Sequence, residues 1–193
     1  TSGAKSQTLL INPYPKEVGL ANLAQQKPDI VIAHETKVPK GDFLIDAPGE
    51  YETKGIYVHG VGENGNTIYF IEIDGFKCLY VGEMMEPHMI PEIFSDISKK
   101  IDILFLPIGG DFTLGKEKHA VLDADAAAKL VRQLSPKVVI PMHYKIPGLN
   151  LKIEGPEKFL KIFGKGKIEA EERILIKEKD IANKDKEIIL LKP

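Results

Sequence analysis

The sequence is poor in cysteine. Its single cysteine, Cys78, has no partner for a disulfide within the chain and stands inside the apolar run FKCLYV. A thiol buried in such a run acts as a small hydrophobic side chain. It also lacks the setting at a strand end or helix start that lowers the pKa of a reactive thiol. The sequence therefore argues against thiol catalysis and fits a reducing compartment.

An excess of basic residues is also missing. The chain has 26 Lys and Arg against 28 Asp and Glu, a formal net charge of -2. Binding to a phosphate backbone needs a basic surface, so a nucleic-acid partner is not indicated. No apolar stretch approaches the roughly 20 residues that span a bilayer, and the initial residues TSGAKSQ do not resemble a signal peptide. We predict a soluble, cytoplasmic protein with no membrane partner. Because the sequence begins without Met, we expect the natural N-terminus to be missing.

Linkers and internal repeats are absent from the 193 residues. We predict one domain covering residues 1–193. In the first half, short β-type runs separated by Pro, Gly and Asp predict a β-meander, namely SQTLLINP, PDIVIAH, GDFLIDAP and GIYVHGV. Two further apolar runs are separated by Asp74-Gly75, the preferred dipeptide of a two-residue hairpin.

The second half predicts a strand-helix-strand unit. The apolar runs IDILFLPIGG and KVVIPMHY flank the segment DADAAAKLVRQLSP, in which apolar residues recur every four positions. Asp123 or Asp125 can cap the first turn of this helix, and Pro136 ends it. The two strands should be parallel neighbours. We also expect short helices at MIPEIFSDISKK and GPEKFLKIFGKG, and two strands or a strand and a turn in residues 167–193.

These phrases, in their order and spacing, resemble the metallo-β-lactamase superfamily. The resemblance runs from about Thr8 to about Gly164, and APGEYE and SPKVVIPMHY are its most specific phrases. The branch concerned is that of predicted Zn-dependent hydrolases similar to L-ascorbate 6-phosphate lactonase. The resemblance implies an α/β fold, a four-layer αβ/βα sandwich, and we expect its first N-terminal strand to be missing. It also implies a metal site at the edge where strands end.

The metal ligands of this family are only partly present. Members carry H-x-H-x-D-H after the strand that corresponds to PDIVIAH, whereas this chain reads HETKVPK. His34 matches the first histidine, and Lys37 occupies the region of the remaining ligands. The family's next histidine is missing, because the loop GENGN has none and His59 lies within the preceding strand. Glu83 replaces the family's bridging aspartate, and His143 in PMHY matches the last histidine.

Three residues therefore remain as candidate metal ligands: His34, Glu83 and His143. Three protein ligands and a water are the minimum for a catalytic zinc site, whereas a two-metal hydrolase needs more. Each residue also has an ordinary interpretation, since His34 can bind a loop carbonyl and Glu83 can begin a helix. Catalytic residues remain unassigned, and the cleft is expected to contain Glu35, Lys37, Gly109, Gly110 and Tyr144.

Other polar residues are given structural roles. We expect Lys37 to replace a metal ion by pairing with Glu83, because a buried polar group without a partner costs about 1 to 3 kcal/mol. His88 and His119 are expected to be solvent-exposed. A turn at Pro48-Gly49 is expected to hold Asp46, Glu50 and Tyr51 in structural roles.

Two functions follow from this partial ligand set. The first is a degenerate member of the fold, without a cofactor, that acts as a binding, regulatory or scaffolding domain. The alternative is a hydrolase with one zinc or manganese ion, acting on a small phosphorylated or lactone-like substrate, as the resemblance implies. We expect a small-molecule ligand and, through an unpaired sheet edge, a homo-oligomer.

Overall fold

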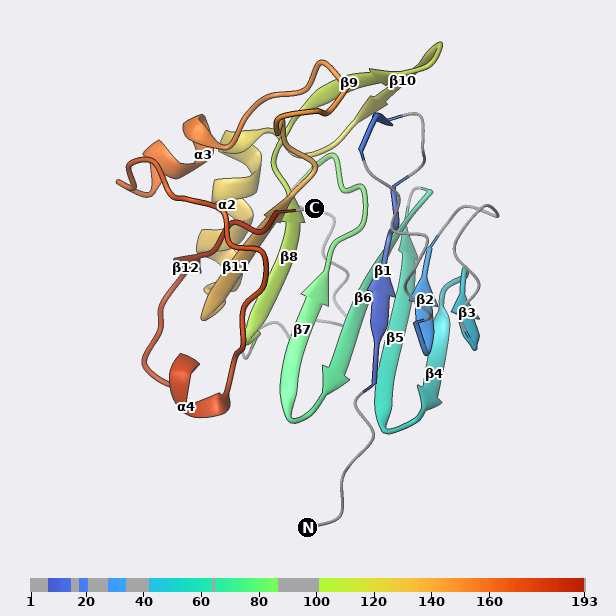
Figure 1. Cartoon of the computed structure of the whole chain (residues 1–193). Coiled ribbons are helices and arrows are strands. Elements are labelled where there is room, and N and C mark those ends of the chain that lie inside the picture. Colours follow the sequence, from blue (N-terminus) through green and yellow to red (C-terminus); the bar gives the residue numbers. More distant parts are fainter. Residues whose placement is uncertain are drawn as a thin grey trace. The chain divides into compact units, whose positions relative to one another are not determined.

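The computed structural model describes residues 7–14, 18–20, 28–33, 42–63, 65–86 and 101–192 (Figure 1). The chain divides into two compact units, which are residues 1–47 with 148–150, and residues 48–147 with 151–193. No helix among the described residues has the length and apolar character needed to cross a membrane.

The first unit contains a parallel three-stranded sheet. Its strands are β1 (Leu9–Ile11), β2 (Ile30–Ile32) and β3 (Phe43–Ile45), with the fully buried β2 in the centre. The predicted meander is wrong here, because a meander joins antiparallel neighbours by short turns. Each of these strands instead pairs in parallel with the next, which requires longer connections.

The second unit contains a seven-stranded sheet in the order β12-β11-β8-β7-β6-β5-β4. Its strands are β4 (Gly49–Thr53), β5 (Ile56–Glu63), β6 (Asn66–Ile73), β7 (Phe76–Tyr80), β8 (Ile103–Pro107), β11 (Val138–Met142) and β12 (Glu187–Ile188). The strands from β12 to β7 are parallel, and those from β7 to β4 alternate in direction. Glu50 and Tyr51, predicted near a turn, lie in β4.

The hairpin predicted at Asp74-Gly75 is confirmed. β6 ends at Ile73, β7 begins at Phe76, and these two residues pair across the turn. Asp74 and Gly75 have φ angles of 49° and 80°. Positive φ at both positions is the geometry that a two-residue turn needs to match the twist of its strands, and Asp-Gly adopts it readily.

The strand-helix-strand unit is also confirmed. β8 and β11 are parallel neighbours, with Ile103 opposite Val138, and helix α2 (Ala124–Leu134) connects them. The side chain of Asp123 accepts a hydrogen bond from the Ala126 amide at 2.8 Å and caps the helix. Ser135, in the left-handed conformation, ends it before Pro136.

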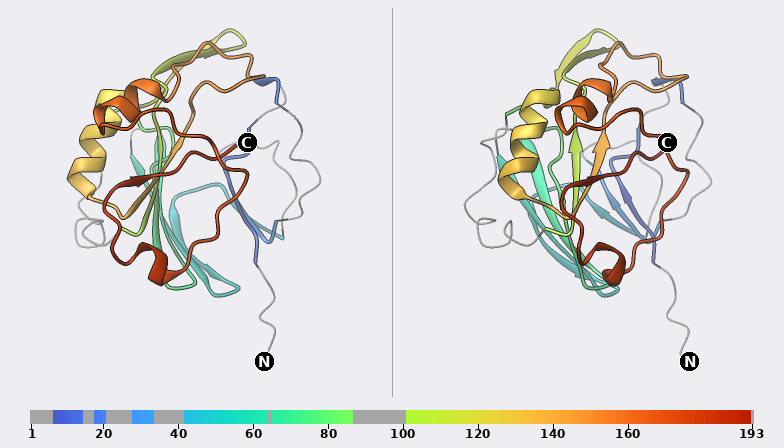
Figure 2. Two further views of the ribbon diagram at one scale, coloured as in Figure 1. Left: turned by 60° about the vertical axis from the view of Figure 1, so that its left-hand side comes forward. Right: turned by 90° about the vertical axis from the view of Figure 1, so that its left-hand side faces the viewer.

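Helices cover one face of the large sheet. Figure 2 shows α2 beside α3 (Glu157–Ile162), the short helix predicted after Pro156. The buried faces of α2 and α3 join apolar side chains of β6, β7, β8 and β11 in one core. Examples from these elements are Leu130, Phe159, Phe70, Leu79, Leu104 and Val139. Burial of these side chains is the main stabilising contribution of this layer.

Two regions differ from the sequence predictions. Residues 167–193 contain a short helix, α4 (Glu178–Ile181), and a two-residue strand, β12, added in parallel to β11. The segment after Gly110 forms a hairpin of β9 (Asp111–Leu114) and β10 (Glu117–Ala120). His119 was expected to be exposed, but its ring stacks on Phe112 with centroids 5.1 Å apart, because β9 and β10 pair these two positions. The helix predicted at MIPEIFSDISKK, with His88, lies outside the described residues.

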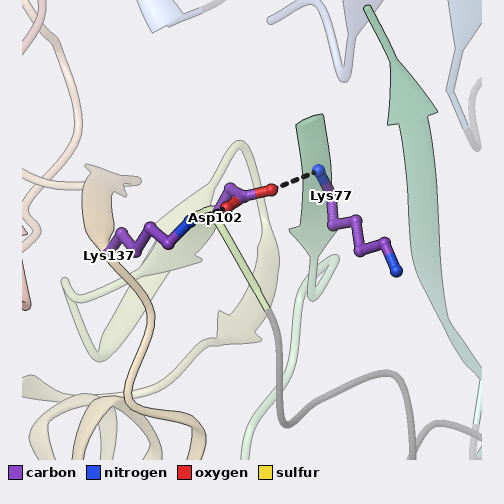
Figure 3. A network of polar contacts seen from close by, with 3 residues as sticks. All are labelled: Lys77, Asp102 and Lys137. Carbon is purple, nitrogen blue, oxygen red and sulfur yellow. Dashed lines mark hydrogen bonds and ion pairs between the residues drawn. The ribbon is translucent and has the colours of Figure 1, made fainter. Parts of the chain in front are cut away.

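A polar network joins the amino-terminal ends of three parallel strands (Figure 3). Asp102, just before β8, accepts a hydrogen bond from the Lys77 amide of β7 at 2.8 Å. Its other oxygen accepts from Nζ of Lys137, just before β11, at 2.7 Å. The network therefore lies at the edge of the sheet where these strands begin, and not at the edge where they end.

Candidate functional site

The candidate site lies where β7, β8 and β11 end. Because the three strands are parallel neighbours, the residues that follow them meet at one edge of the sheet. Backbone hydrogen bonds continue past the strands, from Val81 to Phe105 at 3.3 Å and from Ile108 to Met142 at 3.1 Å. The residues placed at this edge are Gly82 and Glu83 after β7, Gly109 and Gly110 after β8, and His143 and Tyr144 after β11.

His143 has an unusual backbone and a neutral side chain. Its φ angle is 47°, a left-handed conformation that non-glycine residues adopt at an energetic cost, often at functional sites. The Nδ1 atom is buried. Burial lowers the pKa of His143, while the nearby Glu83 carboxylate acts in the opposite direction and raises it. Burial dominates, so the imidazole is neutral at neutral pH and can act as a metal ligand.

Glycine is required beside His143. A Cβ built on Gly109 would collide with the His143 backbone carbonyl and would lie 2.5 Å from the side chain of Ile153. The Gly109 carbonyl accepts a hydrogen bond from the Glu154 amide at 3.2 Å. Gly110, with a φ angle of 68°, directs the chain into the β9–β10 hairpin. Gly109 therefore allows the ends of β8 and β11 to approach closely, and Gly110 allows the turn that follows.

Tyr144 is held by the C-terminal segment. Its hydroxyl donates a hydrogen bond to the Leu191 carbonyl at 3.2 Å, and burial raises its pKa. The ring packs against the hydrophobic core of the second unit. Because the phenol binds a backbone carbonyl and ionises only with difficulty, its observed role is to fix the chain after His143.

Asn66, which the sequence patterns did not single out, holds the turn that carries Glu83 by two hydrogen bonds. The Asn66 side chain accepts a hydrogen bond from the Glu83 amide at 2.8 Å and donates one to the Val81 carbonyl at 2.9 Å. Gly82 between them has a φ angle of 63°. No residue-type pattern marks Asn66, and only the register of β6 against β7 reveals its position.

The structure brings two of the three predicted ligands together. Glu83 and His143 interact electrostatically at the same sheet edge, while His34, Glu35 and Lys37 lie outside the described residues. The predicted pairing of Lys37 with Glu83 therefore stays a prediction. His59 lies within β5, opposite Glu50 and Phe70. In the described part of the chain, no three His, Cys, Asp or Glu residues form a group that could hold a metal ion.

Comparisons with known proteins identify the family. The family model of the β-lactamase superfamily domain matches residues 2–143. The chain belongs to the metallo-β-lactamase superfamily. A crystal structure from Thermotoga maritima, of a candidate Zn-dependent hydrolase of this superfamily, matches with a TM-score of 0.71 and 25% identity. The match covers 96% of this chain and 89% of that one, so the α/β fold of metallo-β-lactamase type is confirmed.

Relatives in sequence carry a related description. A Pyrococcus abyssi protein named a UPF0173 metal-dependent hydrolase is 33% identical over 126 residues, which cover 64% of this chain and 49% of that protein. A protein of the same designation from Nanoarchaeum equitans is 42% identical over 84 residues, covering 42% of this chain and 33% of the relative. The metallo-β-lactamase chain thus spans at most about half the length of these curated relatives.

A second structure resembles the chain in fold alone. It is Igni18, described as a metallo hydrolase of Ignicoccus hospitalis, with a TM-score of 0.51 and 18% identity over 89% of this chain and 79% of Igni18. The names of these relatives give no support to the predicted non-catalytic role and fit the alternative better.

Proposed function

We propose that this protein is a metal-dependent hydrolase with a reduced site for one divalent ion, in which Glu83 and His143 are two ligands. The observation that supports the proposal is their approach at the carboxyl edge of the parallel strands, with the imidazole of His143 kept neutral by burial. Relatives named metal-dependent hydrolases provide the context. Zinc and manganese both accept imidazole and carboxylate ligands.

The available donors fit one ion better than two. A neutral imidazole and a carboxylate supply two of the three protein ligands of a catalytic zinc site. The described residues leave the third ligand unassigned. The described residues contain no group of three or more such side chains, so they offer nothing for a second ion. A single bound ion would supply Lewis acidity and would lower the pKa of a water ligand.

The side chains have separate roles in this proposal. His143 would bind the ion through its imidazole. The close approach of Gly109 and the hydrogen bond of Tyr144 fix the backbone at His143. Glu83 is exposed, so its carboxylate is accessible to both an ion and solvent. Its charge offsets that of a bound cation. The substrate that we propose is a small phosphate ester or lactone, in keeping with the family resemblance.

A second candidate is a binding domain without catalysis. It is favoured by the connection between β5 and β6, where Glu63 pairs directly with Asn66 and only two residues join the strands. The corresponding loop, GENGN, contains no histidine, which removes part of a two-metal site. This candidate would apply if no ion bound at all.

Metal titration separates the two candidates. The protein is purified without chelators, its zinc and manganese are measured, and each ion is titrated calorimetrically into metal-free protein. We expect one ion per chain. Loss of a hydrogen-bond partner of a metal ligand typically weakens metal binding by about 10- to 100-fold. Because Glu83→Gln and His143→Asn change the ligands themselves, each should weaken binding by more than this. Asn is chosen because it tolerates the left-handed backbone at position 143.

Control variants make the result specific. His119→Asn changes a histidine that stacks on Phe112 in the β9–β10 hairpin and should leave the affinity unchanged. If wild-type protein contains no metal and binds none, the hydrolase proposal fails and the binding domain is favoured. With metal bound, hydrolysis of phosphate-ester and lactone substrates then decides the substrate class.

A further inference from the structure

Asn66 occupies the place where the ladder between β6 and β7 stops. The two strands are antiparallel, with Tyr69 opposite Tyr80. The same register places Asn66 opposite Glu83, three residues beyond the end of β7. At Gly82 the chain turns with a φ angle of 63° and leaves the regular ladder. Backbone groups at this point therefore need partners other than a neighbouring strand.

The Asn66 side chain provides these partners. Its Oδ1 accepts from the Glu83 amide at 2.8 Å, and its Nδ2 donates to the Val81 carbonyl at 2.9 Å. One carboxamide thus imitates a peptide group of a paired strand. The Val81 carbonyl and the Glu83 amide flank Gly82, so both sides of the turn are held by one side chain.

The turn has little freedom to adopt another shape. A Cβ on Gly82 would collide with Asn66 Oδ1 and would lie 2.6 Å from the Thr67 carbonyl. The turn therefore packs directly on the first residues of β6, and Thr67 is itself buried. Since β6 begins at Asn66 immediately after the two-residue connection from β5, the position of Asn66 is set by the hairpin.

We propose that Asn66 is a positioning residue that fixes the Glu83 backbone and so holds the Glu83 carboxylate beside His143. Asn66 acts through Glu83 and does not itself bind the ion. Its effect on the backbone is independent of the function proposed above, whereas its effect on metal affinity depends on that function.

Hydrogen exchange tests the anchoring without any metal. Amide exchange is measured by NMR on metal-free wild type and on Asn66→Ala, Asn66→Asp and Asn183→Ala. We expect exchange of the Glu83 amide to accelerate about tenfold or more in Asn66→Ala, as local opening becomes easier, with the Leu104 amide unchanged. Asn66→Asp keeps the acceptor and should restore much of the protection. Asn183 is exposed after α4 and serves as the matched control.

Metal affinity tests the functional consequence. Zinc binding is compared in wild type, Asn66→Ala, Glu83→Gln and the double variant. Asn66→Ala alone should weaken binding by about 10- to 100-fold, and it should have little further effect once Glu83 is changed. Unaltered Glu83 exchange in Asn66→Ala would overturn the positioning role, and so would an equal loss of zinc affinity in the Glu83→Gln background. Faster exchange in a protein that binds no metal would support the anchoring and reject only the hydrolase.

Discussion

Asp102 and Lys137 form an ion pair at 2.7 Å between the starts of β8 and β11. The Asp102 side chain is 13% exposed and also accepts the Lys77 amide of β7. In addition, its own amide donates to the Lys77 carbonyl and its carbonyl accepts from the Val138 amide. A single residue thus connects three neighbouring parallel strands at the end remote from the candidate site.

Loss of this carboxylate should destabilise the fold without affecting the site directly. Asp102→Ala leaves the Lys77 amide without its side-chain acceptor, and we expect unfolding to become easier by about 3 kcal/mol. Lys137→Met removes only a partly exposed ammonium and should cost about 1 kcal/mol or less. Urea denaturation followed by circular dichroism measures both. Equal effects of the two changes would contradict a role centred on Asp102.

Cys78 should remain protonated and unreactive in the folded protein. Burial, assisted by the negative charge of Asp102, raises its pKa from 9.0 to about 12. The unfolded chain ionises near 9, so the stabilisation present below that pH is lost as the pH rises towards 12. We expect a thiol reagent to label native protein slowly at pH 8 and urea-unfolded protein rapidly. Rapid labelling of the native state would show that Cys78 is accessible.

His143 should make the protein sensitive to mild acid. Its folded pKa lies below the ordinary value of 6.5, because burial disfavours the imidazolium. Stability is therefore fully present above pH 6.5 and decreases as the pH falls through the lower folded pKa, since the unfolded chain takes up a proton first. Thermal unfolding between pH 8 and pH 5 should show this slope in wild type and lose it in His143→Asn. An identical slope in the variant would assign the acid sensitivity elsewhere.

Backbone conformation should decide which replacements His143 accepts. At a φ angle of 47°, a β-branched residue is strained, whereas Asn is tolerated. His143→Val should therefore be less stable than His143→Asn by about 1 to 3 kcal/mol. Chemical denaturation at pH 8 makes the comparison independent of the histidine charge. Equal stability would imply that the turn rearranges freely.

Because Gly109 lies against the His143 carbonyl, adding one methyl group at position 109 should lower the stability of the fold strongly. Gly109→Ala forces the ends of β8 and β11 apart and should cost about 2 kcal/mol or more, as overpacking does. Gly166 has no atom within 4 Å of a built Cβ, so Gly166→Ala is the matched control. Differential scanning calorimetry should show a lower melting temperature for the first variant alone. A normal melting temperature for Gly109→Ala would mean that the strand ends yield easily.

Local signals explain which parts of the fold were predictable. Asp74-Gly75 and the Asp123 cap act through backbone geometry within a few residues, so the sequence alone identifies them. The direction of β1, β2 and β3 depends on pairing between residues about 13 to 21 positions apart, as from Leu9 to Ile30, which a local pattern does not encode. The β9–β10 hairpin was not predicted, because the charged residues of β10 are typical of a loop.

Some residues of the candidate site were predictable from the sequence, and others were not. The resemblance to the family, whose ligands follow the corresponding strands, singled out Glu83 and His143. The Asn66 contacts, the left-handed backbone of His143 and the approach of Gly109 arise from tertiary packing and have no sequence signature.

The two-residue connection between β5 and β6 also limits what mutation can achieve. A single substitution would place an aspartate at position 83, where the Asn66 side chain already holds the backbone amide. The connection after β5 has only two residues, since Glu63 is already paired with Asn66. Lengthening this connection to carry a further ligand would act on the residue next to it, Asn66, which holds the Glu83 amide.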